Sequence, residues 1–156
     1  MKARKVKGLN PRAPLAENSA SIIRVRLAEL RSFIPGALRE EAVEEQHHMR
    51  IAAKRLRYIL EITESCFGPD VVVARRRTRD LQGILGDLHD CDVMLPRVGE
   101  HRARSRAADP ATIPGLDALA THLRQRRRQL FGQFREFWLE QEREGIWERL
   151  ERTTAP

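Results

Sequence analysis

The residues with the clearest chemical potential are His47, Arg50, Lys54 and Arg57, which repeat at spacings of three and four. An α-helix turns once every 3.6 residues, so these spacings predict one continuous basic stripe, with Tyr58 and Glu61 beside it. The almost opposite side of the same predicted helix gathers Met49, Ala52, Ala53, Leu56, Ile59, Leu60 and Thr63. A buried helix does not need four positive or protonatable groups in a row, whereas a helix that meets a row of negative charges does. A polyanion is therefore the first ligand to consider.

Two more predicted helices carry basic stripes. Arg75 and Arg79 lie four residues apart, and Arg124, Arg128 and Arg135 repeat at four and seven. Like charges at i and i+4 repel by ~0.2–0.5 kcal/mol per pair, so three such stripes indicate a counter-charge. That counter-charge is either a ligand or a set of internal acids, and the candidates for the second are Asp80, Asp87, Asp90 and Asp92.

The composition fits one helical domain with an anionic partner. The 156 residues suffice for a single core, and 29 Lys plus Arg against 22 Asp plus Glu give a formal charge of +7. Most of the basic residues are arginines, whose planar fork of donors suits phosphate. Cys66 and Cys91 are expected to be reduced core residues. Because the sequence shows neither an apolar run of membrane length nor a secretory signal, we expect a cytoplasmic location.

The positions of apolar residues, prolines and glycines predict an all-α fold, an antiparallel bundle of four main helices with a short fifth helix. We expect helices over about 15–34, 40–66, 70–95 and 115–142, forming a domain over 15–142. Residues 1–14 are predicted to be a flexible basic arm, 97–114 a mobile connection that follows Pro96, and 143–156 a short acidic C-terminal helix or tail. The expected core faces of the first, third and fourth helices contain Ile23, Leu27, Leu30 and Ile34; Leu81, Ile84, Leu85, Leu88 and Leu95; and Leu116, Leu119, Leu123, Leu130, Phe134 and Trp138.

A His-Asp pair introduces an enzymatic alternative. In the HD-type metal-dependent phosphohydrolases, histidines and aspartates in a helical core hold divalent metals. The nearest equivalents in this chain are His47, His89, Asp90 and Asp117. The arginines around His47 argue against it, because they would repel a cation.

Two long segments resemble one known family. The first segment is similar to the signature helix of the CHAD family, the conserved histidine α-helical domain. It reads His47-His48-Met49-Arg50-Ile51-Ala52-Ala53-Lys54-Arg55-Leu56-Arg57-Tyr58-Ile59-Leu60-Glu61. The second segment resembles the second hallmark of that family, a Leu-Gly-x-x-x-Asp-x-x-Val segment. It reads Leu81-Gln82-Gly83-Ile84-Leu85-Gly86-Asp87-Leu88-His89-Asp90-Cys91-Asp92-Val93. Both lie in the expected order, and the similarity covers about residues 15–140.

The resemblance implies a domain that binds inorganic polyphosphate on a basic surface, without catalytic activity or a cofactor. It carries the family histidine over to His47, the basic helix to Arg50, Lys54, Arg55 and Arg57, and further arginines to Arg75, Arg76 and Arg79. The stripe on the fourth helix adds Arg124 and Arg128.

This chain departs from the family in two ways. Family members usually contain two bundles related by a pseudo-twofold axis, and this chain holds one, which predicts either a homodimer or binding of shorter polyphosphate chains. Position 89 is His where the first half of the family often has Arg, a change that either weakens the site or makes it sensitive to pH near neutrality.

Nucleic acid is the alternative binding partner. Binding of single strands usually relies on aromatic groups that stack on bases, and the basic helix offers only Tyr58. That shortage favours a ligand without bases. A purely structural bundle, whose basic stripes are neutralised by Asp and Glu, is the remaining alternative.

Overall fold

The computed structural model describes residues 1–155, which form five α-helices and no strand. The helices are α1 (Leu15–Arg31), α2 (Val43–Thr63), α3 (Pro69–Ala108), α4 (Ile113–Arg143) and α5 (Ile146–Thr153). Short 3₁₀ turns occupy Gly36–Leu38, Glu64–Cys66 and Pro110–Thr112. The all-α bundle predicted from the sequence is confirmed, including the short fifth helix.

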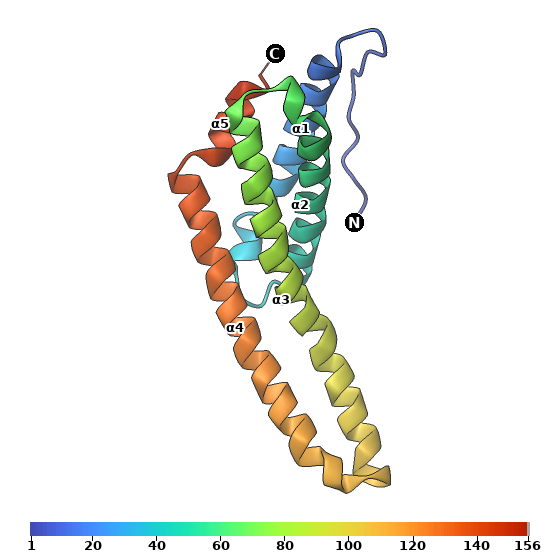
Figure 1. Ribbon diagram of the computed structural model, residues 1–156. Helices are drawn as coiled ribbons and strands as arrows, with labels where there is room; N and C mark the ends of the chain where they lie inside the picture. The colour runs from blue at the N-terminus through green and yellow to red at the C-terminus, as the bar shows by residue number, and fades with distance from the viewer. Residues whose placement is uncertain (156) are drawn as a thin grey trace.

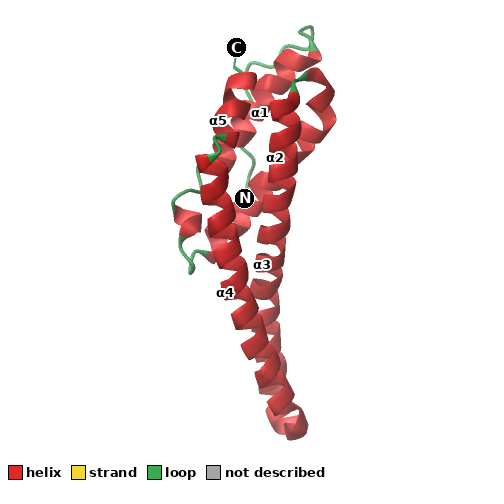
Figure 2. Ribbon diagram, turned by 60° about the vertical axis from the view of Figure 1, so that its left-hand side comes forward, coloured by secondary structure: helices red, strands yellow, loops and turns green. Residues whose placement is uncertain are grey.

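The helix α3 is the central element of the bundle (Figure 1). It packs against α2 on one side and α4 on the other, while α5 contacts its N-terminal half and α1 packs on α2. Figure 2 shows the same elongated arrangement from another side, with the long helices α2, α3 and α4 running roughly along one axis. Among residues 1–155, no helix has an apolar stretch long enough to cross a bilayer.

The predicted apolar face of α2 is the centre of the core. Met49, Ala52, Ala53, Leu56 and Leu60 have no exposed surface. Around them pack residues from the other helices, of which the largest fully buried ones are Ile23, Leu30, Leu81, Leu85, Leu88, Leu130, Phe134, Trp138 and Trp147. The helical spacing of apolar residues therefore identified the core correctly in this half of the molecule.

The C-terminal helix α5 belongs to the same core. Its Ile146, Trp147 and Leu150 are buried, and the Trp147 ring stacks on Trp138 of α4 with centroids 5.4 Å apart. Gly145 lets the chain reverse between the two helices, because its φ of 65° is a left-handed conformation that favours glycine.

The prediction that the third helix ends at Pro96, and that a mobile connection follows, is wrong. The helix α3 continues through Pro96 to Ala108, and only the short segment around Pro110–Thr112 separates it from α4. A proline inside a helix removes one backbone hydrogen bond, but Pro96 lies on the exposed side, and the two helices pack along each other beyond it. The result is a two-helix hairpin that projects beyond the rest of the bundle (Figures 1 and 2).

The projecting hairpin also explains why some predicted core residues are not buried. Leu119 is 41% exposed, and Leu95, Leu116 and Leu123 are only partly buried. Neither α1, α2 nor α5 extends over this part of α3 and α4, so the apolar stripe of α4 has only α3 to pack against. Within the hairpin, Val98 and Ser105 of α3 are the buried positions.

The remaining helix boundaries are close to those predicted. The helix α1 ends at Arg31 rather than near residue 34, because the residue before Pro35 is disfavoured in a helix. The second predicted helix, 40–66, is α2 plus the turn Glu64–Cys66, and the fourth, 115–142, lies within α4. Both cysteines are free thiols, Cys91 buried and Cys66 half-buried.

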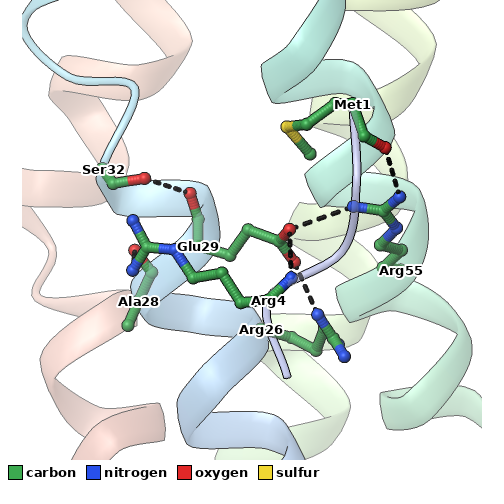
Figure 3. Close-up of polar contacts among 7 residues, drawn as sticks. All are labelled: Met1, Arg4, Arg26, Ala28, Glu29, Ser32 and Arg55. Carbon is green, nitrogen blue, oxygen red and sulfur yellow. Dashed lines mark hydrogen bonds and ion pairs between the residues drawn. The ribbon is translucent and has the colours of Figure 1, made fainter. Parts of the chain in front are cut away.

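Glu29 of α1 joins the N-terminal segment to the bundle (Figure 3). Its carboxylate is 2% exposed and accepts hydrogen bonds from Arg26 at 2.8 Å and from Arg55 of α2 at 3.0 Å. The backbone N–H of Arg4 also donates to it, at 3.2 Å, and Arg55 donates to the carbonyl oxygen of Met1. One buried acid therefore holds α1, α2 and the N-terminal segment together.

We predict that Glu29→Gln lowers the free energy of unfolding by about 2 kcal/mol, because it removes the charge that two arginines share in a buried position. Urea denaturation monitored by circular dichroism measures the change. The control is Glu45→Gln, which removes only the exposed Arg39–Glu45 pair at 3.5 Å and should change stability by less than about 1 kcal/mol. Equal losses in the two variants would contradict the role given to Glu29.

Candidate functional site

Two distances between α2 and α3 show which residues of the two helices lie opposite each other. The Nδ1 atoms of His47 and His89 lie 3.2 Å apart, with ring centroids at 4.4 Å. One helical step further, a Cβ atom built on Gly86 would lie 3.7 Å from Nε of Arg50. The helices are antiparallel, so residues with increasing numbers on α2 lie opposite residues with decreasing numbers on α3. The same register places Lys54 opposite Gln82 and Arg57 opposite Arg79.

We call this row the basic seam. It consists of His47, Arg50, Lys54 and Arg57 on α2 and Arg79, Gln82, Gly86 and His89 on α3. From His47 to Arg57 it extends for about 15 Å, at 1.5 Å per helical residue. Both helices follow alternating steps of three and four, so the row stays along the line where the two helices meet.

The stripe on α2 lies nearer to α3 than a helical wheel suggests. Lys54 is exposed, but His47, Arg50 and Arg57 are half-buried rather than pointing freely into solvent. The stripe forms one edge of the α2–α3 contact, and the matching positions of α3 form the other edge. A ligand on the seam would therefore contact both helices at once.

The cations of the seam lack an internal counter-charge at most positions. Among residues 1–155, no carboxylate forms an ion pair with Arg50, Lys54 or Arg79. Only Arg57 has a carboxylate partner, Glu61, at 3.4 Å on the same helix. The Nε atoms of Arg50 and Arg57 and the side-chain oxygen of Gln82 are buried without a hydrogen-bond partner. The seam thus holds polar groups that the described protein does not satisfy.

The internal acids proposed from the sequence are used elsewhere. Asp87 pairs with Arg126 at 3.7 Å, and Asp92 pairs with Arg127, both partners being on α4. Among residues 1–155, Asp80 and Asp90 are exposed and form no ion pair. These four acids therefore do not neutralise the seam.

Arg57 is oriented by two neighbours on α2. Its guanidinium lies 4.7 Å from the centroid of the Tyr58 ring, a cation–π contact, while Glu61 holds it from the next turn. The Lys54 ammonium lies 5.7 Å from the same ring centroid. Tyr58 is 44% exposed, but its ring already has the two cations near it.

A polar network from α4 holds the His47 end of the seam in place. Arg127 donates to Asp92 on α3, to the side-chain oxygen of Gln46 on α2 at 3.0 Å, and to the carbonyl oxygen of Glu40 at 3.0 Å. Gln46 is buried and donates in turn to the carbonyl oxygen of Arg39 at 2.7 Å. Since Gln46 precedes His47 and Asp92 lies three residues after His89, this network joins α2, α3 and α4 next to both histidines.

Burial and neighbouring charge lower the pKa of His47. Burial makes the largest contribution, followed by the positive charges of His89, His48 and Arg50 and, more weakly, the amino group of Met1. Each of these effects disfavours the imidazolium form. His47 therefore favours the neutral imidazole in the unliganded protein.

Some predicted site residues lie outside the seam. Arg55 points to the other side of α2 and pairs with the buried Glu29 at 3.0 Å. Arg75 pairs with Glu64 just beyond the end of the seam, and Arg76 is exposed about 100° further round α3.

The two arginines predicted on α4 are also outside the seam. Arg124 and Arg128 are exposed. The helical repeat places them on the same side of α4 as Glu142, which forms an ion pair at 3.9 Å with Arg31 of α1. The helix α3 lies between α4 and α2 (Figure 1), and it is Arg127 that reaches α2. The three predicted stripes therefore do not form one continuous wall.

The residues of the metal-enzyme alternative do not gather at one place. His47 and His89 are in contact, but Asp117 pairs with Arg102 in the projecting hairpin, and this bond lowers the pKa of its carboxyl group. Among residues 1–155, no group of three His, Cys, Asp or Glu residues is placed to hold a metal ion.

Reasoning from the sequence alone left Gln82 and Gly86 out of the site and left open whether His89 takes part in it. The signal for them was present, because Arg75, Arg79, Gln82, Gly86 and His89 repeat at the same alternating steps as the α2 stripe. The missing information was that the two stripes face each other in antiparallel register.

Comparison with known proteins agrees with the geometry. A protein-family model described as CHAD domain matches residues 21–154. No curated protein and no solved structure matches the chain. The matched region includes all of α2, α3 and α4, and therefore both motifs of the seam. Because the match covers nearly the whole chain, this protein belongs to the CHAD family.

Proposed function

We propose that this protein binds inorganic polyphosphate along the basic seam and performs no catalytic step on it. The observation that carries the proposal is the row of cations shared by α2 and α3, in which Arg50, Lys54 and Arg79 have no carboxylate partner among residues 1–155. A linear anion with regularly spaced charges is the ligand that such a row complements. Membership of the CHAD family supports this class of ligand.

The surroundings of Tyr58 favour polyphosphate over nucleic acid. A base would need an open aromatic face, and this ring already has Lys54 and Arg57 near it. The arginine forks and the Lys54 ammonium can bind phosphate oxygens without any base. Titration with single-stranded DNA of matched charge is therefore the comparison that tests specificity, and equal affinity would reduce the seam to a generic basic surface.

We predict that Arg50→Ala combined with Lys54→Ala weakens binding of long-chain polyphosphate at least about tenfold near 0.1 M salt. The slope of log affinity against log salt should fall by roughly 1.4, because each lost contact with a single-stranded anion removes roughly 0.7. Isothermal titration calorimetry at several salt concentrations measures both quantities.

The matched control is Arg104→Ala combined with Arg106→Ala, which removes the same charge from exposed positions of the projecting hairpin. These residues lie roughly 20 Å along α3 from His89, beyond the screening length of about 10 Å at 0.1 M salt. Their affinity should stay within about twofold of the unmodified protein. Equal weakening by the two double variants would move the site away from the seam. A third double variant, Arg124→Ala with Arg128→Ala, decides whether α4 contributes.

A second prediction uses the glycines of α3. Glutamate at position 86 would place a carboxylate beside Arg50, since a Cβ there already comes within 3.7 Å of its Nε. We expect Gly86→Glu to weaken polyphosphate binding about tenfold or more, because the new carboxylate both pairs with Arg50 and repels phosphate. Fluorescence competition with a labelled polyphosphate measures the loss.

Gly99→Glu provides the control, because it makes the same chemical change on the same helix at a position with open space around it. Replacing a mid-helix glycine removes a conformational cost of up to about 1 kcal/mol, so neither variant should unfold the protein. Unchanged binding by Gly86→Glu would show that phosphate does not pass beside Arg50.

We also propose a homodimer, because one chain carries one seam of about 15 Å and a long polyphosphate extends well beyond it. We predict that light scattering detects a dimer in the presence of long-chain polyphosphate. A monomer that binds long chains with one chain per protein would contradict this proposal, and the short seam would then define the bound length.

A further inference from the structure

His89 ends the basic seam on α3 and contacts His47, which ends the seam on α2. The Nδ1 atoms of His47 and His89 face each other at 3.2 Å across the α2–α3 contact. At this distance one Nδ1 must donate its proton and the other must accept with its lone pair. If both rings were imidazolium, each Nδ1 would carry a proton, and two N–H groups and two positive charges would face each other. In this geometry the pair therefore holds at most one excess proton.

The groups around the pair add to this restriction. On α2, His48 and Arg50 flank His47, and the amino group of Met1 contributes a further weak positive charge. On α3, Asp87 and Asp92 lie two and three residues from His89, and Arg126 and Arg127 of α4 pair with them. Asp90 is exposed and follows His89 on the next position of the helix. The described residues therefore supply little negative charge to stabilise a second proton.

A phosphate group changes that balance. A phosphate oxygen placed over the pair can accept an N–H from each ring, which replaces one imidazole–imidazole bond by two charge-assisted bonds. The negative charge of the phosphate removes the repulsion that excludes the second proton. Gly86 lies three residues from His89 and carries no side chain, so the Arg50 side chain lies against the backbone of α3 one turn from the pair.

We infer that His47 and His89 together form a phosphate subsite that takes up a proton when polyphosphate binds. This inference rests on the proposed function and adds a second histidine to it, with a linkage between binding and pH. The sign follows from the proton balance. The bound state holds more protons than the free state, so affinity rises as the pH falls. Because the pKa of His47 is lowered in the free protein, the change should extend from near neutrality toward lower pH.

Calorimetry in pairs of buffers tests the inference. Long-chain polyphosphate is titrated into the protein at pH 7 in two buffers with different ionisation enthalpies, and the difference in heat gives the number of protons taken up. We expect net uptake by the unmodified protein and an affinity that falls about tenfold from pH 6 to pH 8. His89→Gln should remove the uptake, because an amide donates a hydrogen bond to phosphate without titrating.

Two further variants make the test specific. His122→Gln removes an exposed histidine of α4 outside the seam and should keep both the uptake and the pH dependence. Any proton that polyphosphate itself binds would persist in His89→Gln, so the difference between that variant and the unmodified protein gives the uptake by the pair. His89→Arg puts a permanent cation in the subsite, so its affinity should stay high at pH 8 and lose its pH dependence. This variant also serves if His89→Gln fails to fold.

The outcomes separate the two proposals. If the unmodified protein binds polyphosphate without proton uptake, or if His89→Gln and His89→Arg both retain the uptake, the subsite is wrong while the binding function stands. If the unmodified protein does not bind polyphosphate at either pH, the proposed function itself is wrong. Uptake that is lost in both His89 variants and kept in His122→Gln supports the subsite.

Discussion

The antiparallel packing of α2 on α3 in one register is the constraint on which the rest of the structure depends. Ala52 and Ala53 are buried where α2 enters the core, and such small side chains allow helices to approach closely. Once this register is set, positions with alternating steps of three and four face each other along the whole contact. The meeting of His47 with His89, and of Arg50 with Gly86, follows from backbone geometry rather than from any attraction between those side chains.

Charge is distributed unevenly over this framework. Several arginines outside the seam have carboxylate partners, including Arg26 and Arg55 on Glu29 and Arg31 on the glutamates of α4 and α5. These pairs hold elements together, and the acidic C-terminal part of the chain supplies many of them. On the seam, positive groups converge with few internal partners. These cations repel one another, and an external anion bound beside them would reduce that repulsion. The local destabilisation would then favour binding of the anion.

The sequence predicted the helical class, the core face of α2 and the basic stripe, because each depends on the periodicity of a single helix. It did not predict which neighbour would cover which stripe. Arg55 is two residues from Arg57, but its partner is Glu29, which lies 26 residues earlier in the chain. Likewise, Pro96 and Leu119 were misinterpreted because a helical wheel does not show where the covering helices end. Information of this kind depends on tertiary packing, which a single sequence does not display.

The projecting hairpin has a consequence for local unfolding. Beyond the end of the bundle, α3 and α4 bury side chains only against each other, so the free energy needed to open a helical turn must decrease toward Pro110. The N-terminal half of the same α3 is enclosed by α2, α4 and α5. One uninterrupted helix therefore combines a slowly exchanging half, which carries the α3 residues of the basic seam, with a half whose amide protons can exchange while the seam keeps its shape.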